Sequence, residues 1–401
     1  MPSHWRLKFG RLPKDLILIG GMLTLVEGIL WYFLPNYFQS KLNDMFLVGI
    51  VISAYSAGRM LVSLPAGDIT DQIGRKFTFI LGVIGFVASV FFLFMGSFFY
   101  FTLFMLLFGI FTIVYSIPTD AALLDRCTKQ NVPLVVGLAD MLHNFGWGFG
   151  PVVAGFLLMY FRVPTFISIV ILTLVAISVF ALFFFPGKSH FRMKEFRRSR
   201  KILLDDKLCI GSIKRLWTLG KPLLAILTFS FAFGFWEYAI WTFEPIWTRW
   251  IGASVLLGAF ILMLDSAPYI PFSLMAGAVT NKIGLNKMFA IGAIFTLVGQ
   301  SFFLFHQSLL TLALTLVITP LGVSFLTIPM EVYIKRHVKG NVYGQVYGAD
   351  NMVYDIGGVI APLVVGSIAV MENISAIIYV CFALFLISIT ALTFTFVTKK
   401  L

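Results

Sequence analysis

Residues 63–74 (SLPAGDITDQIG) and residues 273–284 (SLMAGAVTNKIG) are two versions of one segment, 210 positions apart in the chain. Seven of the twelve positions are identical, and glycine, serine and threonine supply much of the match. A shared apolar composition therefore does not explain the similarity. Repetition at a fixed spacing indicates a duplicated structural unit.

The same spacing relates other parts of the chain. A shift of 210 places Glu27-x-x-x-Trp31-x-x-x-Pro35 on Glu237-x-x-x-Trp241-x-x-x-Pro245, and Ala139-Asp140 on Ala349-Asp350. A shift of 211 places Gly146, Pro151 and Gly155 on Gly357, Pro362 and Gly366. The sequence therefore predicts an N-terminal half at 1–186, a basic linker at 187–221 and a C-terminal half at 222–401.

The composition excludes a soluble protein. Of the 401 residues, 59% are apolar and only 12% are charged, whereas soluble domains carry about 25% charged residues. Soluble enzymes, nucleic-acid binders and secreted disulfide-rich folds are therefore excluded. Cys127, Cys209 and Cys381 are far apart and odd in number, which argues against a disulfide framework or a zinc site.

The apolar residues form continuous runs long enough to cross a membrane as helices. A bilayer core of about 30 Å requires about 20 apolar residues per helix, and continuous runs without alternation exclude a barrel. We predict an all-α membrane protein with twelve spans, at 16–35, 46–66, 77–97, 99–118, 133–157, 164–186, 222–243, 254–276, 288–306, 309–329, 343–367 and 374–397.

The basic residues predict the orientation. Of the 30 Lys and Arg residues, 26 lie on the side that holds both termini and the linker. Cytoplasmic loops are rich in these residues, so we expect an integral multi-pass protein of the plasma membrane with both termini in the cytoplasm. Attraction to anionic lipid headgroups accounts for the net charge of +12 without a nucleic-acid partner.

Six spans per half is an even number, so the second half enters the membrane in the same orientation as the first. Such parallel repeats are related by an axis along the membrane normal, and they place a substrate site between the halves near mid-membrane. This architecture indicates a transporter.

The loop between the second and third spans carries a family motif. Residues 67–76 read GDITDQIGRK, which resembles the signature G-x-x-x-D-x-x-G-R-K of the major facilitator superfamily in the same loop. The resemblance extends over essentially the whole chain. It implies the twelve-span fold of that family, with a cytoplasmic gate built from Gly67, Asp71, Gly74, Arg75, Lys76 and Asp125.

The physical roles in this gate follow from the residue types. Gly67 permits close helix approach and Gly74 a tight turn, while Asp71 suits the amino end of a neighbouring helix. Arg75 is suited to pair with a carboxylate such as Asp125. In the family such contacts hold the halves together on the cytoplasmic side. The alternative is an ordinary basic loop with a turn.

The fifth span carries a second motif. Residues 146–155 (GWGFGPVVAG) are similar to the G-x-x-x-G-P-x-x-G-G motif of the proton antiporters of the family, with Ala154 in place of one glycine. Gly146, Gly150, Pro151 and Gly155 are therefore candidates for a coupling motif, or for close helix packing alone. Residues 99–118 contain no arginine, although many antiporters of the family carry one there.

Ionisable side chains inside a span are costly and mark functional sites. Glu27 and Glu237 occupy equivalent places in spans 1 and 7, which line the cavity in the family. Burial disfavours a charged carboxyl group, so either could carry protons or bind substrate; the alternative is a structural role between helices. The other candidates for this site are Asp265, Arg59, Asp140, Trp31 and Trp241.

Arg59 needs an acidic partner, for which Asp265 and Asp140 are the candidates. Six embedded acids (Glu27, Asp140, Glu237, Asp265, Asp350 and Asp355) face one embedded base, so the cavity is expected to be acidic. The tryptophans are suited to stack on a ring or a cation, or to anchor and pack.

Together these features predict a secondary-active transporter that works by alternating access and exports a cationic or neutral amphipathic molecule in exchange for protons. The alternatives are proton symport or uniport of a sugar-like metabolite, and a membrane receptor or scaffold that does not transport. We expect no enzyme activity and no cofactor. The chain has no phosphate-binding G-x-x-x-x-G-K-[ST] segment, so we expect that ATP does not drive it, and no cluster of His, Cys and Asp predicts a metal site. The expected partners are a small-molecule substrate, protons and the lipid bilayer, and the protein is expected to be monomeric.

Overall fold

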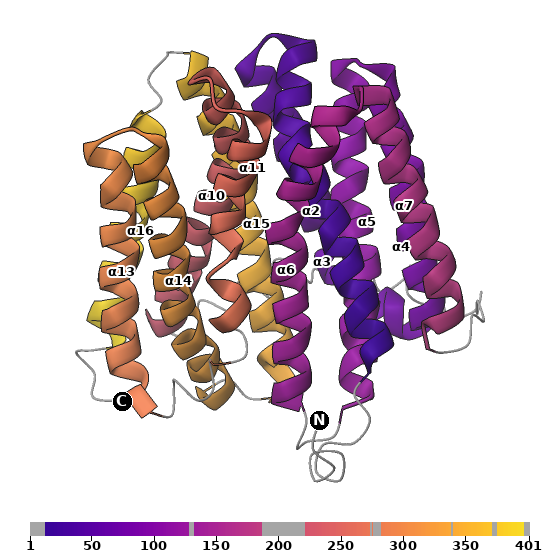
Figure 1. Cartoon of the computed structure of the whole chain (residues 1–401). Coiled ribbons are helices and arrows are strands. Elements are labelled where there is room, and N and C mark those ends of the chain that lie inside the picture. The colour runs from indigo at the N-terminus through magenta and orange to yellow at the C-terminus, as the bar shows by residue number, and fades with distance from the viewer. Residues whose placement is uncertain are drawn as a thin grey trace, which may run out of the picture.

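A computed structural model describes residues 13–127, 132–186, 221–272, 275, 282–337, 340–370 and 375–396. All regular elements in these ranges are helices, and twelve are α-helices (Figure 1). The first half of the repeat contains α2 (Lys14–Leu42), α3 (Met45–Ile73), α4 (Arg75–Val90), α5 (Phe98–Asp125), α6 (Val132–Tyr160) and α7 (Val163–Phe184). The second contains α10 (Lys221–Trp250), α11 (Val255–Ser266), α13 (Leu285–Phe305), α14 (Leu309–His337), α15 (Gly340–Val370) and α16 (Ser375–Phe396).

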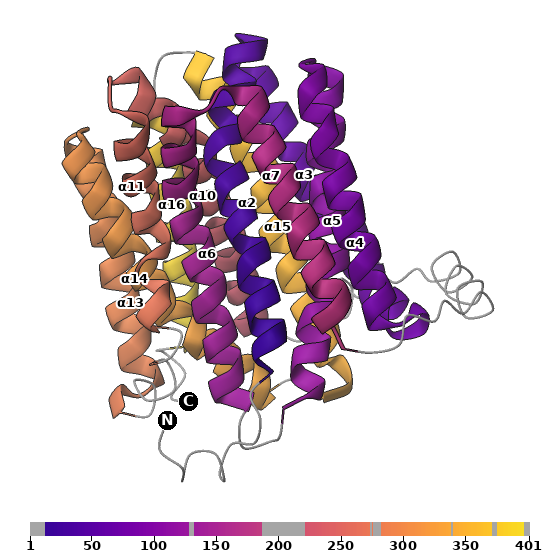
Figure 2. The same ribbon diagram turned by 45° about the vertical axis from the view of Figure 1, so that its right-hand side comes forward.

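Eleven of these segments are long and apolar enough to cross a membrane, which confirms the predicted helical membrane fold. The remaining helix, α6, is not among them, and glycines and the polar Asp140, His143 and Asn144 occupy its middle. It packs between α2 and α11 (Figure 2), so it needs less lipid-compatible surface. Most predicted spans are extended in the structure by one or two helical turns. The predicted linker at 187–221 lies outside the described residues except for Lys221, where α10 begins.

Equivalent turns in the two halves carry a glycine at the same position. Gly74 joins α3 to α4 with φ of 103°, and Gly284, 210 positions later, precedes α13 with φ of 81°. Only glycine adopts such a backbone without strain, which explains why both copies carry it. Side chains cap other helix starts: Asp44 accepts from Phe46 N at 2.8 Å at the start of α3.

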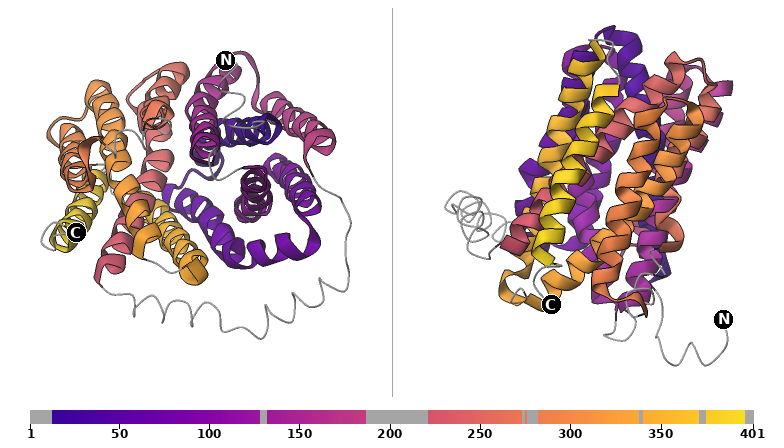
Figure 3. Two further views of the ribbon diagram at one scale, coloured as in Figure 1. Left: turned by 90° about the horizontal axis from the view of Figure 1, so that it is seen from below. Right: turned by 90° about the vertical axis from the view of Figure 1, so that its left-hand side faces the viewer.

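The helices of the two halves pack in the same pattern. The pairing of α2 with α6 recurs as α10 with α15, that of α3 with α5 as α11 with α14, and that of α4 with α7 as α13 with α16. Viewed along the helices, the two groups of six lie side by side (Figure 3). The structure therefore confirms two parallel six-helix repeats.

Three helix pairs join the halves: α3 with α15, α6 with α11, and α2 with α10. Small residues permit this contact, as at Gly155, where a Cβ would lie 2.8 Å from Ala259 Cβ of α11. We call the side on which α2 begins and α16 ends the terminal face, and the other side the opposite face. Since the number of spans is even, both ends of the described chain lie at the terminal face.

One helix of the second half is broken. The α-helix α11 ends at Ser266, two turn residues follow, and a short helical segment resumes at Tyr269. Pro268 lacks the N–H that a continuous helix would use. Interrupted helices commonly build binding sites at membrane depth, and both Ser266 and Tyr269 line the cavity described below.

The close approach of α2 and α6 generates a test of the packing. A Cβ at Gly150 would lie 2.6 Å from the backbone of Gly28. We expect Gly150→Val to destabilise the protein by about 1–3 kcal/mol or more, because backbone cannot move aside as a side chain can. Thermal unfolding in detergent measures the effect. The control is Phe156→Leu on an exposed position of the same helix, and equal loss in both variants would contradict the packing assignment.

Candidate functional site

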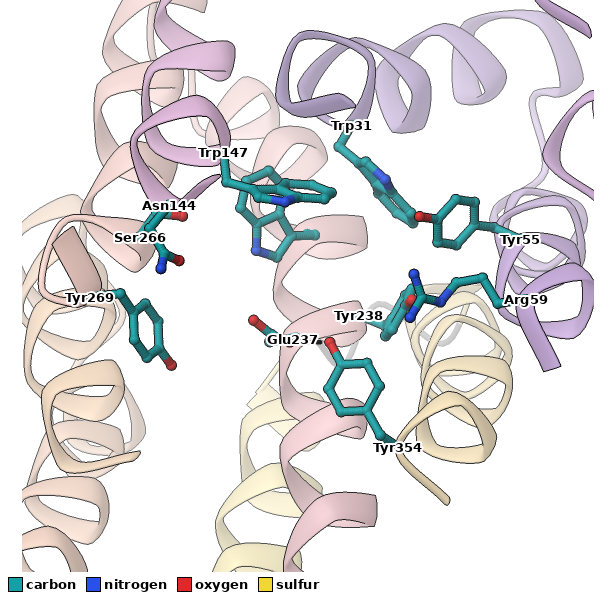
Figure 4. Close-up of a pocket in the computed structure, with 11 residues that line it drawn as sticks. Trp31, Tyr55, Arg59, Asn144, Trp147, Glu237, Tyr238, Ser266, Tyr269 and Tyr354 are labelled. Atoms are coloured by element: carbon teal, nitrogen blue, oxygen red, sulfur yellow. Dashed lines mark hydrogen bonds between the residues drawn. The ribbon is translucent and has the colours of Figure 1, made fainter. Parts of the chain in front are cut away.

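A cavity of about 260 Å³ lies between the two halves (Figure 4). Helices α2, α3 and α6 of the first half and α10, α11 and α15 of the second contribute to its wall. Seven of the eleven lining residues are aromatic. The lining consists of Trp31, Tyr55, Arg59, Asn144, Trp147, Glu237, Tyr238, Trp241, Ser266, Tyr269 and Tyr354.

The cavity continues toward the terminal face. A second hollow of about 410 Å³ shares Arg59, Asn144, Glu237, Tyr269 and Tyr354 with the first. It extends past Ser230 of α10 and Asn351 of α15, each about a third of the way along its helix, and to Ile334 near the end of α14. These residues lie on the terminal-face side of Glu237, so the central cavity extends toward that face.

Contacts between the halves close the opposite side. Asn36 Nδ2 of α2 donates to Pro245 O of α10 at 2.8 Å. The hydroxyl of Tyr32 donates to the backbone carbonyl of Val255 at the start of α11. Both contacts join the first half to the second, between the cavity and the opposite face. The described structure is thus open toward one face and sealed toward the other.

Aromatic rings form the wall nearest the opposite face. Trp31 stands edge-on to Tyr55, with ring centroids 5.0 Å apart, and to Tyr238 at 5.7 Å. Trp147 stands edge-on to Trp241 at 5.1 Å. Each contact except that of Trp31 with Tyr55 crosses between the halves. The rings present faces and edges on which a flat or cationic molecule can pack.

The embedded arginine is paired across the halves. Arg59 Nε of α3 donates to Asp355 Oδ1 of α15 at 2.9 Å, and Asp355 is fully buried. The guanidinium carbon lies 5.8 Å from the centre of the Tyr55 ring. The predicted partners, Asp265 and Asp140, are therefore wrong. The reason is geometric: α3 and α15 run antiparallel, so the depth of Arg59 is also the depth of Asp355.

Glu237 is the acidic residue that lines the cavity. It accepts a hydrogen bond from the Tyr354 hydroxyl of α15, and Figure 4 shows these two groups pointing toward each other. Asp265 lies behind the lining: it is buried and accepts from Trp241 Nε1 at 3.0 Å. Asp265 thus orients an aromatic wall residue, whereas Glu237 is available to a bound molecule.

Glu27 is placed differently from its repeat equivalent Glu237. It is buried within α2, interacts electrostatically with Arg59, and is not among the residues that line the two described cavities. Asp140 is exposed on α6 toward the terminal face. Asp350 lines the second cavity, where Ser230 donates to its carboxylate.

The motif residues between α3 and α4 contact the first half. Arg75 donates to the Asp125 carboxylate and, at 2.8 Å, to Ala121 O, which fastens the start of α4 to the end of α5. Lys76 Nζ donates to Leu182 O of α7 at 2.8 Å. Both interactions lie within one half, whereas the family resemblance implied a tie between halves.

Two other gate residues, Gly67 and Asp71, belong to α3, but their surroundings lie outside what the structure describes. In the second motif, Gly146 and Gly150 face α2, and Gly155 faces α11. Pro151 is buried within α6. This arrangement gives the glycines a packing role on both sides of α6.

Several lining residues were not predicted. The tyrosines and the amide and hydroxyl side chains of the wall were missed, namely Tyr55, Tyr238, Tyr269, Tyr354, Asn144 and Ser266. Helical spacing carried a signal for one of them: Tyr354 follows Asp350 by four residues and therefore shares its face. Glu244 of α10, which is fully buried, was also missed.

Apolar helices in two repeats around a central cavity define a membrane transport protein. The model of the Major Facilitator Superfamily matches the chain twice, over residues 16–249 and 224–400. The chain therefore belongs to this superfamily, as the sequence predicted.

Solved structures support the same fold. The crystal structure of the human organic anion transporter MFSD10 (TETRAN) aligns with 98% of this chain and 100% of its own, at 17% identity and a TM-score of 0.68. The crystal structure of the nucleoside transporter NupG gives the same coverage, 13% identity and a TM-score of 0.74. No curated protein sequence matches the chain. At these identities the similarity shows the fold alone.

The ion pair predicts non-additive mutations. Removing one member of a buried pair leaves a charge without a partner, which costs about 3–5 kcal/mol. We therefore expect Arg59→Leu and Asp355→Leu each to lower the unfolding temperature strongly, and the double variant to recover part of the loss. Thermal unfolding of the four proteins gives the coupling energy. Additive losses would contradict a direct pairing.

Proposed function

We propose that the protein exports a cationic or neutral amphipathic molecule in exchange for protons, by alternating exposure of the central cavity. Membership of the superfamily supports secondary transport. The observation that carries the finer proposal is the charge of the cavity wall. Asp355 neutralises Arg59, while Glu237 faces the cavity with a tyrosine hydroxyl as its partner.

Electrostatics favours this class of substrate. The wall offers one carboxyl group that no cation pairs with among the described residues, and several aromatic faces. A cation is attracted both by a carboxylate and by the faces of tryptophan and tyrosine. An anion would meet an arginine that is already paired. The wall therefore favours a cation, or a neutral molecule when Glu237 is protonated.

A single carboxyl group such as that of Glu237 is enough to couple the movement of a substrate to the movement of protons. If a proton and a cationic substrate compete for one carboxyl group, the release of one accompanies the binding of the other. Alternation of the cavity between the two faces then converts a proton gradient into net export. This scheme requires no arginine in α5, which distinguishes it from the arrangement of many antiporters in the family.

A second part of the proposal concerns how the two halves of the protein move. We propose that 1–186 and 222–401 move as units joined by the linker 187–221, and that the terminal face is cytoplasmic because it carries most of the Lys and Arg residues. We further propose a monomer in the plasma membrane. In the described state the cavity would then be open to the cytoplasm.

A second candidate is uptake of a neutral polar metabolite by proton symport or uniport. Asn144, Ser266 and the tyrosine hydroxyls favour it, because they can donate and accept hydrogen bonds with a sugar-like molecule. The names of the two similar structures, an organic anion transporter and a nucleoside transporter, do not decide between the candidates.

A ligand screen tests the proposal. A ligand that binds the folded protein raises its unfolding temperature by mass action. We expect hits among amines and flat amphipathic compounds, with stronger stabilisation at pH 8 than at pH 6, because protons compete for Glu237. Trp147→Ala should remove the stabilisation, and Phe149→Ala, exposed on the same helix, should keep it. Hits restricted to sugars or anions would contradict the proposal.

The glutamate variants test coupling. In vesicles that contain purified protein, we expect Glu237→Gln to abolish substrate movement driven by a pH gradient, because glutamine cannot exchange a proton. Binding of neutral substrate should persist. The matched variant Glu27→Gln, in the equivalent position outside the cavity lining, should retain movement driven by the gradient. Wild-type accumulation by Glu237→Gln would refute the role of Glu237.

A further inference from the structure

Glu244 of α10 is an embedded acid that the proposed exchange does not use. It lies two helical turns beyond Glu237, toward the opposite face, and its side chain is fully buried. The equivalent position in the first half, 210 residues earlier, is Leu34, which is also fully buried. One copy of the repeat therefore carries a carboxyl group where the other carries a hydrocarbon side chain.

The carboxyl group has no cationic partner in the described part of the chain. Neither of its oxygens makes a hydrogen bond of good geometry there, and the Thr248 hydroxyl, one turn along α10, is the polar side chain that interacts with it. The same hydroxyl donates a hydrogen bond to the backbone carbonyl of Glu244, at 2.8 Å. None of the ion pairs among the described residues includes Glu244.

The neighbouring elements bring no positive charge to it. The titratable groups that interact with the carboxyl group are Tyr32 of α2 and Asp265 of α11. On the other helices near α10, α14 has no ionisable residue between Leu309 and Met330. The remaining described groups on the helices around α10 are Lys14, Asp15, Glu27, Tyr37 and Lys41 of α2, Glu237, Tyr238 and Arg249 of α10, His306 after α13, Asp350, Tyr354 and Asp355 of α15, and Tyr379 and Cys381 of α16.

None of these remaining groups forms an ion pair with Glu244 or is among the groups that act on its carboxyl. Asp355 and Tyr354 are engaged at the depth of Arg59 and Glu237, and Asp350 contacts Ser230 further toward the terminal face. Arg249 and His306 are exposed. Arg249 lines a surface pocket with Tyr32 and Thr248, but it is not among the groups that act on the Glu244 carboxyl. A charged carboxylate buried without compensation is very costly, and such a group takes up a proton instead. Glu244 is therefore neutral in the described state.

The position of Glu244 links this proton to the seal on the opposite side. The next residue, Pro245, accepts the hydrogen bond from Asn36 of α2. Tyr32, which interacts with the carboxyl group, donates across the halves to Val255 of α11. Opening of the opposite face must separate α2 from α10 and α11. That movement removes the first half from around Glu244 and admits water.

We propose that Glu244 is a second proton-binding site, which locks the opposite face closed when it is protonated and favours opening when it loses its proton. The inference rests on the alternating exposure proposed above, but it does not depend on the substrate. The sealed state binds one proton more than the open state. A low pH therefore favours the sealed state, and a high pH favours the open state.

Distances across the opposite face test this inference. Spin labels at Ser40 of α2 and Trp250 of α10 would report opening, in protein whose Cys127, Cys209 and Cys381 are replaced by alanine. In lipid nanodiscs we expect the ratio of long to short distances to rise about tenfold per pH unit while Glu244 titrates, because the states differ by one proton.

Two variants test whether Glu244 causes the pH dependence of opening. Glu244→Gln, which stays neutral, should keep the short distance at every pH. Glu244→Leu, which copies Leu34 of the first half, should behave alike and provides a second test if the glutamine variant folds poorly. Glu237→Gln should keep the pH dependence of the wild type. A pH dependence that survives in both Glu244 variants, or that is absent from the wild type, overturns the lock. The vesicle assay of Glu237 is independent of either result.

Discussion

Inside a membrane, an ionisable side chain must be paired, protonated or turned toward water. This constraint determines how the charged residues are arranged between the two halves of the protein. Arg59 meets it by pairing with Asp355 across the two halves. Glu237 meets it by facing a cavity with a tyrosine partner. Glu244 has neither solution, so it must hold a proton while the opposite face is sealed. In the proposed mechanism these three groups account for the charge of the cavity, the coupling to protons and the closure of the opposite face.

The duplication supplies the scaffold, and departures from it supply the specific chemistry. Equivalent helix pairs pack alike in both halves, so the frame is nearly symmetric. The acids are not. Glu237 lines the cavity, whereas its equivalent Glu27 is enclosed near Arg59. Glu244 replaces Leu34, and a proline breaks the helix that carries Asp265. The different responses of the two faces to protons in our proposal depend on this asymmetry of charges within a nearly symmetric frame.

Much of the fold could be predicted from the sequence, because span length, the repeat and the glycine turns at Gly74 and Gly284 are local or periodic signals. The list of embedded acids and tryptophans also included Glu237 and Trp241, which the structure places in the cavity wall. The partner of Arg59 was missed because pairing depends on the crossing of α3 and α15, which no local pattern encodes. Most of the tyrosine wall was missed for the same reason, since the face of a helix that turns toward the cavity depends on how the helices pack; only Tyr354 carried a local signal, its spacing of four residues from Asp350.

The central claim is that one cavity is reached alternately from both sides of the membrane. The most direct measurement uses Ser266→Cys in a background without other cysteines, because this residue lines the cavity and lies beside the break in α11. Vesicles with oriented protein would be exposed to a membrane-impermeant thiol reagent from either side. The account predicts that the cysteine reacts from both faces, faster at the terminal face under acidic conditions. Reaction from one face only, at every pH, would contradict it.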